Sequence, residues 1–217
     1  MAKGGEFENE VSRDLSLWVT NGVRDDIFGR SDGSGSRFTA RKKKGKDTAN
    51  MAGDITFTDE LGIPLISIWN LEAKTGYGDK QKIKDKSGTV IKNIQTRWDI
   101  LDNLDSNSKI TIFFQMWNQC QRDADMTARI PVLILRRNRR PKCIAIRNDY
   151  FLSLRSRFGD FKKMNVIINE PEKEICINVM NLKDFFAWIP GDFLATKPTN
   201  CDSLSPLKFN RSKIHSR

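Results

Sequence analysis

This chain of 217 residues has almost no histidine, and none of its cysteines are close together in sequence. Its single histidine, His215, is close to the C-terminus, and its four cysteines are far apart with no C-x-x-C pair. Histidine catalysis, histidine metal sites and a zinc-binding cysteine cluster are therefore not expected. We expect the cysteines to be reduced thiols with a structural role.

Long apolar runs are absent as well. No stretch approaches the roughly 20 apolar residues that span a bilayer, and the N-terminus, MAKGGEFENE, lacks the apolar core of a signal peptide. We therefore expect a cytoplasmic protein with no membrane partner.

Basic residues exceed acidic ones. The sequence has 37 Lys and Arg against 27 Asp and Glu, which gives a net charge of +10. Such an excess favours a polyanionic partner such as nucleic acid, although basic faces that only aid solubility explain the same charge. The length and the hydrophobic content of 38% fit one globular domain.

The most informative stretch covers residues 52–74, AGDITFTDELGIPLISIWNLEAK. Two β-like runs, residues 55–58 and 64–73, flank the turn-rich DELG segment, which predicts an antiparallel hairpin. The second run is apolar on both faces, as in a central strand. The hairpin would place Asp54 opposite Glu72, with Lys74 on the same side as Glu72. A turn aspartate beside a solvated Glu–Lys pair is the alternative.

This constellation, G-D-I-x-(strand)-E-A-K, resembles the PD-(D/E)xK nuclease superfamily, with Gly53 at the position of the proline. The resemblance implies that Asp54 and Glu72 ligate Mg²⁺, for which Mn²⁺ can substitute, and that the backbone carbonyl of Ala73 is a further ligand. It also implies that Lys74 acts on the attacking water.

An amphipathic helix is predicted upstream, over residues 5–20. Glu8 borders its apolar stripe, where it can favour the positive end of the helix dipole. The ordered matches G-x-x-x-E, R-S-x-G-S and E-x-K resemble Holliday-junction resolvases of archaeal and phage type. That resemblance implies that Glu8 is a further metal ligand and that Ser34 contacts the scissile phosphate, with Ser31 and Ser36 as alternatives.

A glycine- and serine-rich loop and a basic run follow this helix. We expect the loop and the run to contact DNA, while a flexible linker is the alternative. The residues concerned are Arg30, Ser34, Arg41, Lys42, Lys43, Lys44 and Lys46. Residues 75–109 are polar and predict a surface excursion with a short helix over residues 91–104.

A second helix is predicted over residues 110–126, with Phe113, Trp117 and Cys120 on its apolar stripe. By the resemblance, Gln119 orients the water in preference to Gln115, and a surface amide is the alternative. Strands over residues 130–136 and 142–147 complete the core. A helix, two strands and a short helix are predicted between residues 148 and 190.

The sequence thus predicts an α/β restriction-endonuclease-like core, a central mixed sheet flanked by helices. We expect one nuclease domain over residues 1–190, with its recognisable core at about 4–147, a C-terminal elaboration at 148–190 and a mobile basic tail at 191–217. The expected activity is that of an Mg²⁺-dependent endodeoxyribonuclease acting on branched DNA as a homodimer, in the host cytoplasm if a phage encodes it. A restriction or repair endonuclease, an RNA nuclease and a basic DNA-binding protein that does not cut are the alternatives.

Overall fold

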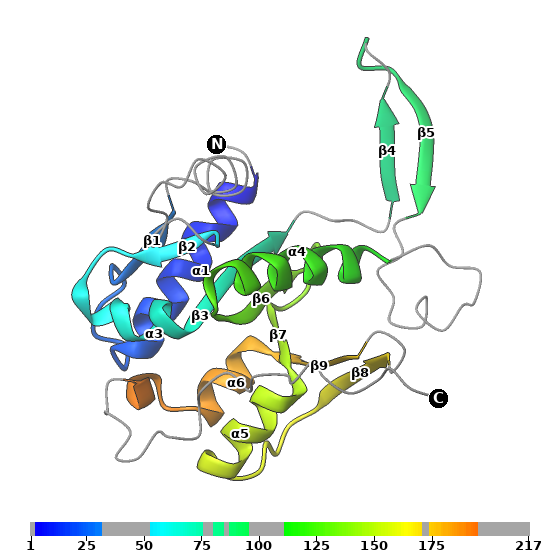
Figure 1. The fold of residues 1–217 in the computed structure, drawn as a ribbon. Helices are drawn as coiled ribbons and strands as arrows, with labels where there is room; N and C mark the ends of the chain where they lie inside the picture. The colour runs from blue at the N-terminus through cyan, green and yellow to red at the C-terminus, as the bar shows by residue number, and fades with distance from the viewer. Residues whose placement is uncertain are drawn as a thin grey trace, which may run out of the picture.

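A computed structural model describes residues 3–31, 53–75, 80–84, 87–95, 111–170 and 174–194, which form a mixed α/β fold (Figure 1). In chain order the elements are α1 (Lys3–Val19), β1 (Phe28–Arg30), β2 (Ile55–Phe57), η1 (Glu60–Gly62), α3 (Ile63–Ile68), β3 (Trp69–Thr75), β4 (Lys80–Lys84), β5 (Val90–Gln95), α4 (Ile112–Thr127), β6 (Ile130–Arg136), β7 (Cys143–Arg147), α5 (Asn148–Phe158), β8 (Asn165–Glu170), β9 (Ile175–Asn181), α6 (Leu182–Trp188) and η4 (Gly191–Leu194).

The core is a five-stranded mixed sheet in the order β3-β6-β7-β9-β8. Strand β3 runs parallel to β6, and every other neighbouring pair is antiparallel. The β3–β6 register places Glu72 beside Leu133. The predicted mixed sheet is therefore confirmed.

Helices cover both faces of this sheet. Alternate residues of β6 point to opposite faces: Val132 and Ile134 join the apolar cluster of α1, α5 and α6, while Leu133 and Leu135 join the cluster of α4. Because Glu72 lies beside Leu133, it projects toward α4. The layers thus direct Glu72 of β3 toward α4.

The predicted hairpin is wrong. Strand β2 pairs with β1, and the first part of the supposed second strand is the short helix α3. Pro64 suits the first turn of a helix because its missing N–H needs no partner there. Among the described strands, β3 pairs in the sheet with β6 alone, so it is not central. One face of β3 is apolar, since Trp69 and Leu71 belong to the apolar cluster of α1. The other face, toward α4, carries Glu72 and Lys74, so the expectation of two apolar faces is wrong for this strand.

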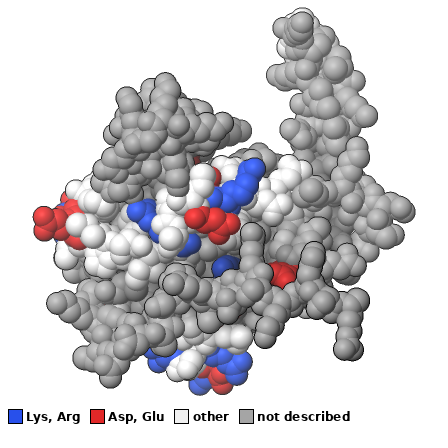
Figure 2. All heavy atoms as spheres, in the orientation of Figure 1, with Lys and Arg blue, Asp and Glu red and all other residues white. Residues whose placement is uncertain are grey.

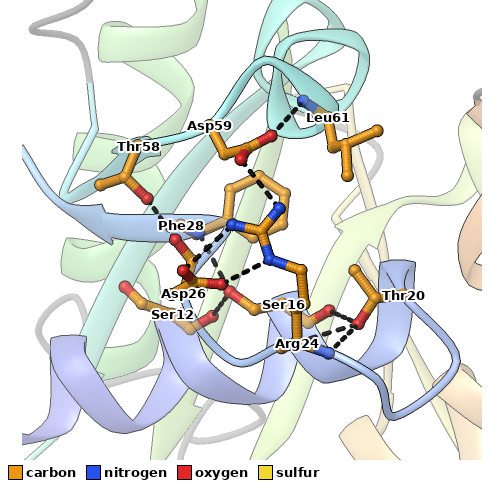
Figure 3. Close-up of polar contacts among 9 residues, drawn as sticks. All are labelled: Ser12, Ser16, Thr20, Arg24, Asp26, Phe28, Thr58, Asp59 and Leu61. Atoms are coloured by element: carbon orange, nitrogen blue, oxygen red, sulfur yellow. Dashed lines mark hydrogen bonds and ion pairs between the residues drawn. The ribbon is translucent and has the colours of Figure 1, made fainter.

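A polar network fixes β1 and β2 to α1 (Figure 3). The Phe28 backbone N–H donates to Ser16 Oγ at 3.0 Å, which joins β1 to the helix. The Arg24 guanidinium contacts Asp26 and reaches Asp59, which caps η1, at 2.9 Å in each case. These contacts hold the end of β2 and the beginning of η1, while the start of β2 is held by the pairing of Ile55 with Arg30 at the end of β1.

Residues 75–109 were expected to be an excursion with a short helix. Instead β4 and β5 form an antiparallel ribbon with a register shift at Ile83–Lys84, and Figure 1 shows it standing away from the sheet. The predicted helix is therefore wrong over residues 91–95. Ile91 and Ile94 are three positions apart, a spacing that also fits a helix, so the local pattern favoured the wrong element. The rest of that prediction lies outside the described residues.

The helix–strand–strand–helix order predicted for residues 148–190 is confirmed by α5, β8, β9 and α6. This segment closes back on the N-terminal helix. Trp18 Nε1 donates to the carbonyl of Ile189 at 2.9 Å, and the Trp18 ring stacks on Phe186 at 4.6 Å. A Cβ on Gly191 would lie 1.9 Å from the carbonyl oxygen of Trp18, so only glycine fits there. The expected mobile tail was placed too early, because its first residues, 191–194, form η4 with Phe193 buried in the core. The rest of the tail, from 195 onward, lies outside the described residues.

The predicted thiols are free at Cys120, Cys143 and Cys176, and Cys201 is outside the described residues. Within the described part of the chain, every helix is too short or too polar to cross a membrane.

Candidate active site

Strand β3, helix α4 and the residue before β2 bring four side chains together at the edge of the sheet. Lys74 Nζ contacts Glu72 Oε1 and lies 3.5 Å from Asp54 Oδ2. Gln119 Nε2, from α4, donates to Glu72 Oε1 at 2.7 Å. Glu72 is only 2% exposed. Two carboxylates, an ammonium and an amide therefore share one largely buried position.

Asp54 is held against β3 by two backbone contacts. Its N–H donates to the carbonyl of Leu71 at 2.8 Å, and its Oδ2 accepts the N–H of Ala73 at 3.0 Å. The sequence correctly placed Asp54 opposite Glu72, but the contact is made by the residue before β2 and not by a hairpin ladder. Asp54 is 6% exposed, so its carboxylate faces the interior of the site.

Gly53 makes this approach possible. Its φ is +80°, and a Cβ would lie 2.6 Å from the carbonyl oxygen of Leu71. Proline holds φ near −65°, so the proline of the written family motif cannot adopt this backbone. The departure at Gly53 is thus a requirement of the local structure.

Ser31 supports the same loop from the end of β1. Its Oγ donates to the carbonyl of Gly53 at 2.6 Å, and its N–H donates to the carbonyl of Asp54 at 3.0 Å. Ser31 was an alternative to Ser34 as the loop serine. Through these two hydrogen bonds Ser31 holds the backbone of Gly53 and Asp54 in place.

The electrostatics of the site favour a cation. Burial and then the nearby charge of Asp54 raise the pKa of Glu72 to about 7, while Lys74 opposes the rise. Two close carboxylates in a dry position repel each other unless a positive charge lies between them. Lys74 partly meets that need.

The oxygen atoms of the site fit a small divalent ion. The N–H and C=O of one strand residue point to the same side, so the carbonyl of Ala73 faces Asp54 as its N–H does. Asp54, Glu72 and this carbonyl are hard oxygen donors of the kind that Mg²⁺ and Mn²⁺ prefer. Mg²⁺ commonly takes one or two carboxylates and fills its remaining positions with water or phosphate oxygen.

Glu8 of α1 contacts Arg30 at the end of β1. Its Oε2 forms an ion pair with Arg30 Nε at 2.5 Å, and no group of three Asp, Glu, His or Cys side chains able to hold a metal occurs among the described residues. The structure therefore does not bring Glu8 together with Asp54 and Glu72 as one ligand set. The side chain of Arg30, expected to contact DNA, is 46% exposed.

Several expected residues cannot be placed. Ser34 and its alternative Ser36, and the basic residues expected to bind DNA, lie outside the described residues: Arg41, Lys42, Lys43, Lys44 and Lys46. On the face drawn in Figure 2, the basic and acidic side chains of the described residues are interspersed. The described part of that face is therefore not a one-sign surface.

Two nearby residues were not singled out from the sequence. Asp123 follows Gln119 by four residues on α4; burial raises its pKa, and the charge of Asp54 also raises it. The spacing of four was the available signal, because it places both side chains on one helix face. Asn70 precedes Glu72 by two residues on the same face of β3, is fully buried, and has no hydrogen-bond partner for its amide within the described ranges.

A comparison with protein families gives a match that runs from the middle of the chain toward its C-terminus. The family model "Phage putative PDDEXK endonuclease" matches residues 86–195, just over half of the chain. This range begins after Lys74 and contains Gln119 and Asp123. No curated protein and no solved structure matches the chain. With the five-stranded mixed sheet and its flanking helices, the matched range shows that the chain belongs to the phage PDDEXK endonuclease family.

Proposed function

We propose that the chain is an Mg²⁺-dependent endodeoxyribonuclease that hydrolyses phosphodiester bonds in branched DNA, with Mn²⁺ able to replace Mg²⁺. The observation that carries the proposal is the convergence of Asp54, Glu72, Lys74 and Gln119 at one buried end of β3. A module that only binds DNA has no use for two buried carboxylates, which repel phosphate unless a cation lies between them.

The ligand roles follow from the donors. Asp54, Glu72 and the carbonyl of Ala73 would hold the ion. When bound, the ion would polarise the phosphate and lower the pKa of a bound water. Asp54 is positioned by the Ala73 N–H, while Glu72 is positioned by Gln119. Both carboxylates are thus oriented before any ion binds, which limits reorganisation during the reaction.

Lys74 and Gln119 act around these ligands. Lys74 can swing from the carboxylates to the phosphate oxygens, where its positive charge offsets the negative charge of the transition state. Because Lys74 contacts both carboxylates, charge stabilisation and water orientation are the roles that we propose for it. Gln119, with one hydrogen bond to Glu72, has a second N–H and a carbonyl available for water.

The branched substrate is the finer part of the proposal. It is supported by the order in which Glu8, Arg30–Ser31, Asp54 and Glu72–Lys74 occur, which resembles junction resolvases. A four-way junction presents two symmetric strands, so we propose a homodimer that cuts both in the host cytoplasm. Glu8 then serves to position Arg30 near the DNA, consistent with their ion pair.

The proposal is tested by cleavage of a labelled four-way junction beside duplex and single-stranded controls, with Mg²⁺ or EDTA. The wild type should make paired symmetric nicks in the junction alone. Asp54→Asn should lose cleavage and Mg²⁺ binding measured by calorimetry, while DNA binding persists. The matched control is Asp160→Asn, which alters an exposed aspartate paired with Arg155 far along the chain.

Each outcome separates the alternatives. Equal cutting of duplex would show an endonuclease of restriction or repair type, and cutting of matched RNA would show an RNA nuclease. Mg²⁺ binding that survives Asp54→Asn would refute the ligand assignment. DNA binding without cleavage of any substrate would refute the enzymatic proposal.

A further inference from the structure

Within the described residues, strand β8 has a strand partner on one side of its backbone alone. It is the last strand in the order β3-β6-β7-β9-β8 and pairs with β9 over six consecutive residues. In the part of the chain that the structure describes, no strand pairs with its other side. An open row of backbone N–H and C=O groups is a template for another strand.

Exposed apolar side chains gather on this edge. Met164 is 87% exposed, Val166 41% and Ile167 56%. They are three of the eight large exposed apolar residues in the described ranges, and they fall within four consecutive positions. Such grouping marks a contact surface more often than scattered single residues do.

The edge also lacks the features that keep edge strands apart. Proteins protect such edges with lysine, proline or a β-bulge. Residues 164–169, MNVIIN, contain no charge and no proline, and the β8–β9 register is regular. We infer that another strand covers this edge in the working protein.

The charges that flank β8 identify the occupant. Exposed Lys162 and Lys163 precede the strand, Glu170 ends it, and exposed Glu174 follows it. If a second β8 pairs antiparallel, the basic end of each strand meets the acidic end of the other, and the uncharged centres face each other. A parallel partner would place like charges together, which opposes association.

We propose that β8 pairs antiparallel with β8 of a second copy of this chain, with the two-fold axis near Ile167. The two sheets then form one continuous ten-stranded sheet, since each contributes its five strands. This pairing supplies the surface for the homodimer of the proposed function. The argument for it uses only β8 and its flanking residues, not the residues of the active site. Strand β3, with Asp54 and Glu72 against it, is at the opposite edge of each sheet and stays clear of the interface.

Sedimentation velocity of the full chain tests this pairing. The wild type should sediment at twice its mass of 24.9 kDa at micromolar concentration. Ile167→Lys should raise the dimer dissociation constant at least about 100-fold, because two lysines face each other and two apolar contacts are lost. The matched control is Val23→Lys, which changes an apolar residue that is 81% exposed outside the sheet and should remain dimeric.

Crosslinking gives an independent readout. Ile167→Cys should be joined to its copy by a short bismaleimide more efficiently than the wild type or Val23→Cys. A monomeric wild type, a dimer unaffected by Ile167→Lys, or equal crosslinking of both cysteine variants would overturn the pairing. Mg²⁺ binding to Ile167→Lys should match that of the wild type, so a failed interface and a failed metal site are distinguishable.

Discussion

Gly53 offers the sharpest test of how the site is built. Gly53→Ala should destabilise the protein by about 4 kcal/mol. The positive φ contributes about 1–2 kcal/mol. The rest comes from the two hydrogen bonds that hold Asp54 to β3, which are its N–H to the Leu71 carbonyl and the Ala73 N–H to its carboxylate. The clash is unavoidable because the new Cβ would lie 2.6 Å from a backbone carbonyl oxygen. Gly53→Pro, which restores the written family motif, should be worse still because φ is +80°.

Gly22 is the matched control, since its φ is +86° and a Cβ added there would meet no atom within 4 Å. Gly22→Ala should cost only the positive-φ penalty of about 1–2 kcal/mol. Urea unfolding in EDTA measures both free energies, and calorimetry measures Mg²⁺ affinity, which only Gly53→Ala should lower. Equal destabilisation by the two variants, with unchanged Mg²⁺ affinity, would refute the close-approach argument.

Three further predictions concern the site and the core. The pKa of Glu72 is near 7 in the folded protein against 4.5 in the reference state, so stability in EDTA should fall by about 3 kcal/mol as pH rises through that window; urea unfolding of Glu72→Gln should lack this fall. Gln119→Leu removes a donor that favours ionised Glu72, so the pH midpoint of Mg²⁺ binding by calorimetry should rise, and an unchanged midpoint would contradict the role. Tyr150→Phe leaves Trp69 Nε1 without its 2.8 Å partner and should cost about 1–3 kcal/mol in urea unfolding, whereas an unaffected midpoint would show that the bond adds nothing.

Helical periodicity was the most informative sequence signal for the fold. The stripe of Phe113, Trp117 and Cys120 predicts a helix with one buried face, and all three are buried in α4. In a helix of this length the period of 3.6 repeats several times and cannot be confused with a strand. The same reasoning holds for α1.

Short apolar segments carried less information. Residues 63–68 have only six positions, too few to separate a helical from a strand period, and their isoleucines favour a strand. The structure makes them a helix because Pro64 begins it and Leu65 and Ile66 turn inward. The place of β3 beside β6 depends on contacts some 60 residues apart, which no local pattern encodes.

The site could be predicted only in part, because some of its contacts are between residues close in sequence and others are not. Asp54 and Glu72 are near neighbours along the chain, so any compact turn between them brings their side chains together. Glu72 and Gln119 meet only because α4 packs on the sheet, and the family resemblance, not the pattern, suggested that contact. Asp123 shares that helix face, and its spacing of four from Gln119 is the one local signal that could have drawn attention to it.

The contact between Trp18 and Ile189 has a consequence for the newly synthesised chain. The two residues are 171 positions apart, and ribosomes add about 5–20 residues per second, so α1 waits about 10–30 s for its last partner. Trp18 also stacks on Trp69 of β3 at 5.9 Å, so the residue that receives this late contact packs directly on the strand that carries Glu72. A nascent chain should therefore remain without nuclease activity until its C-terminal helices leave the ribosome.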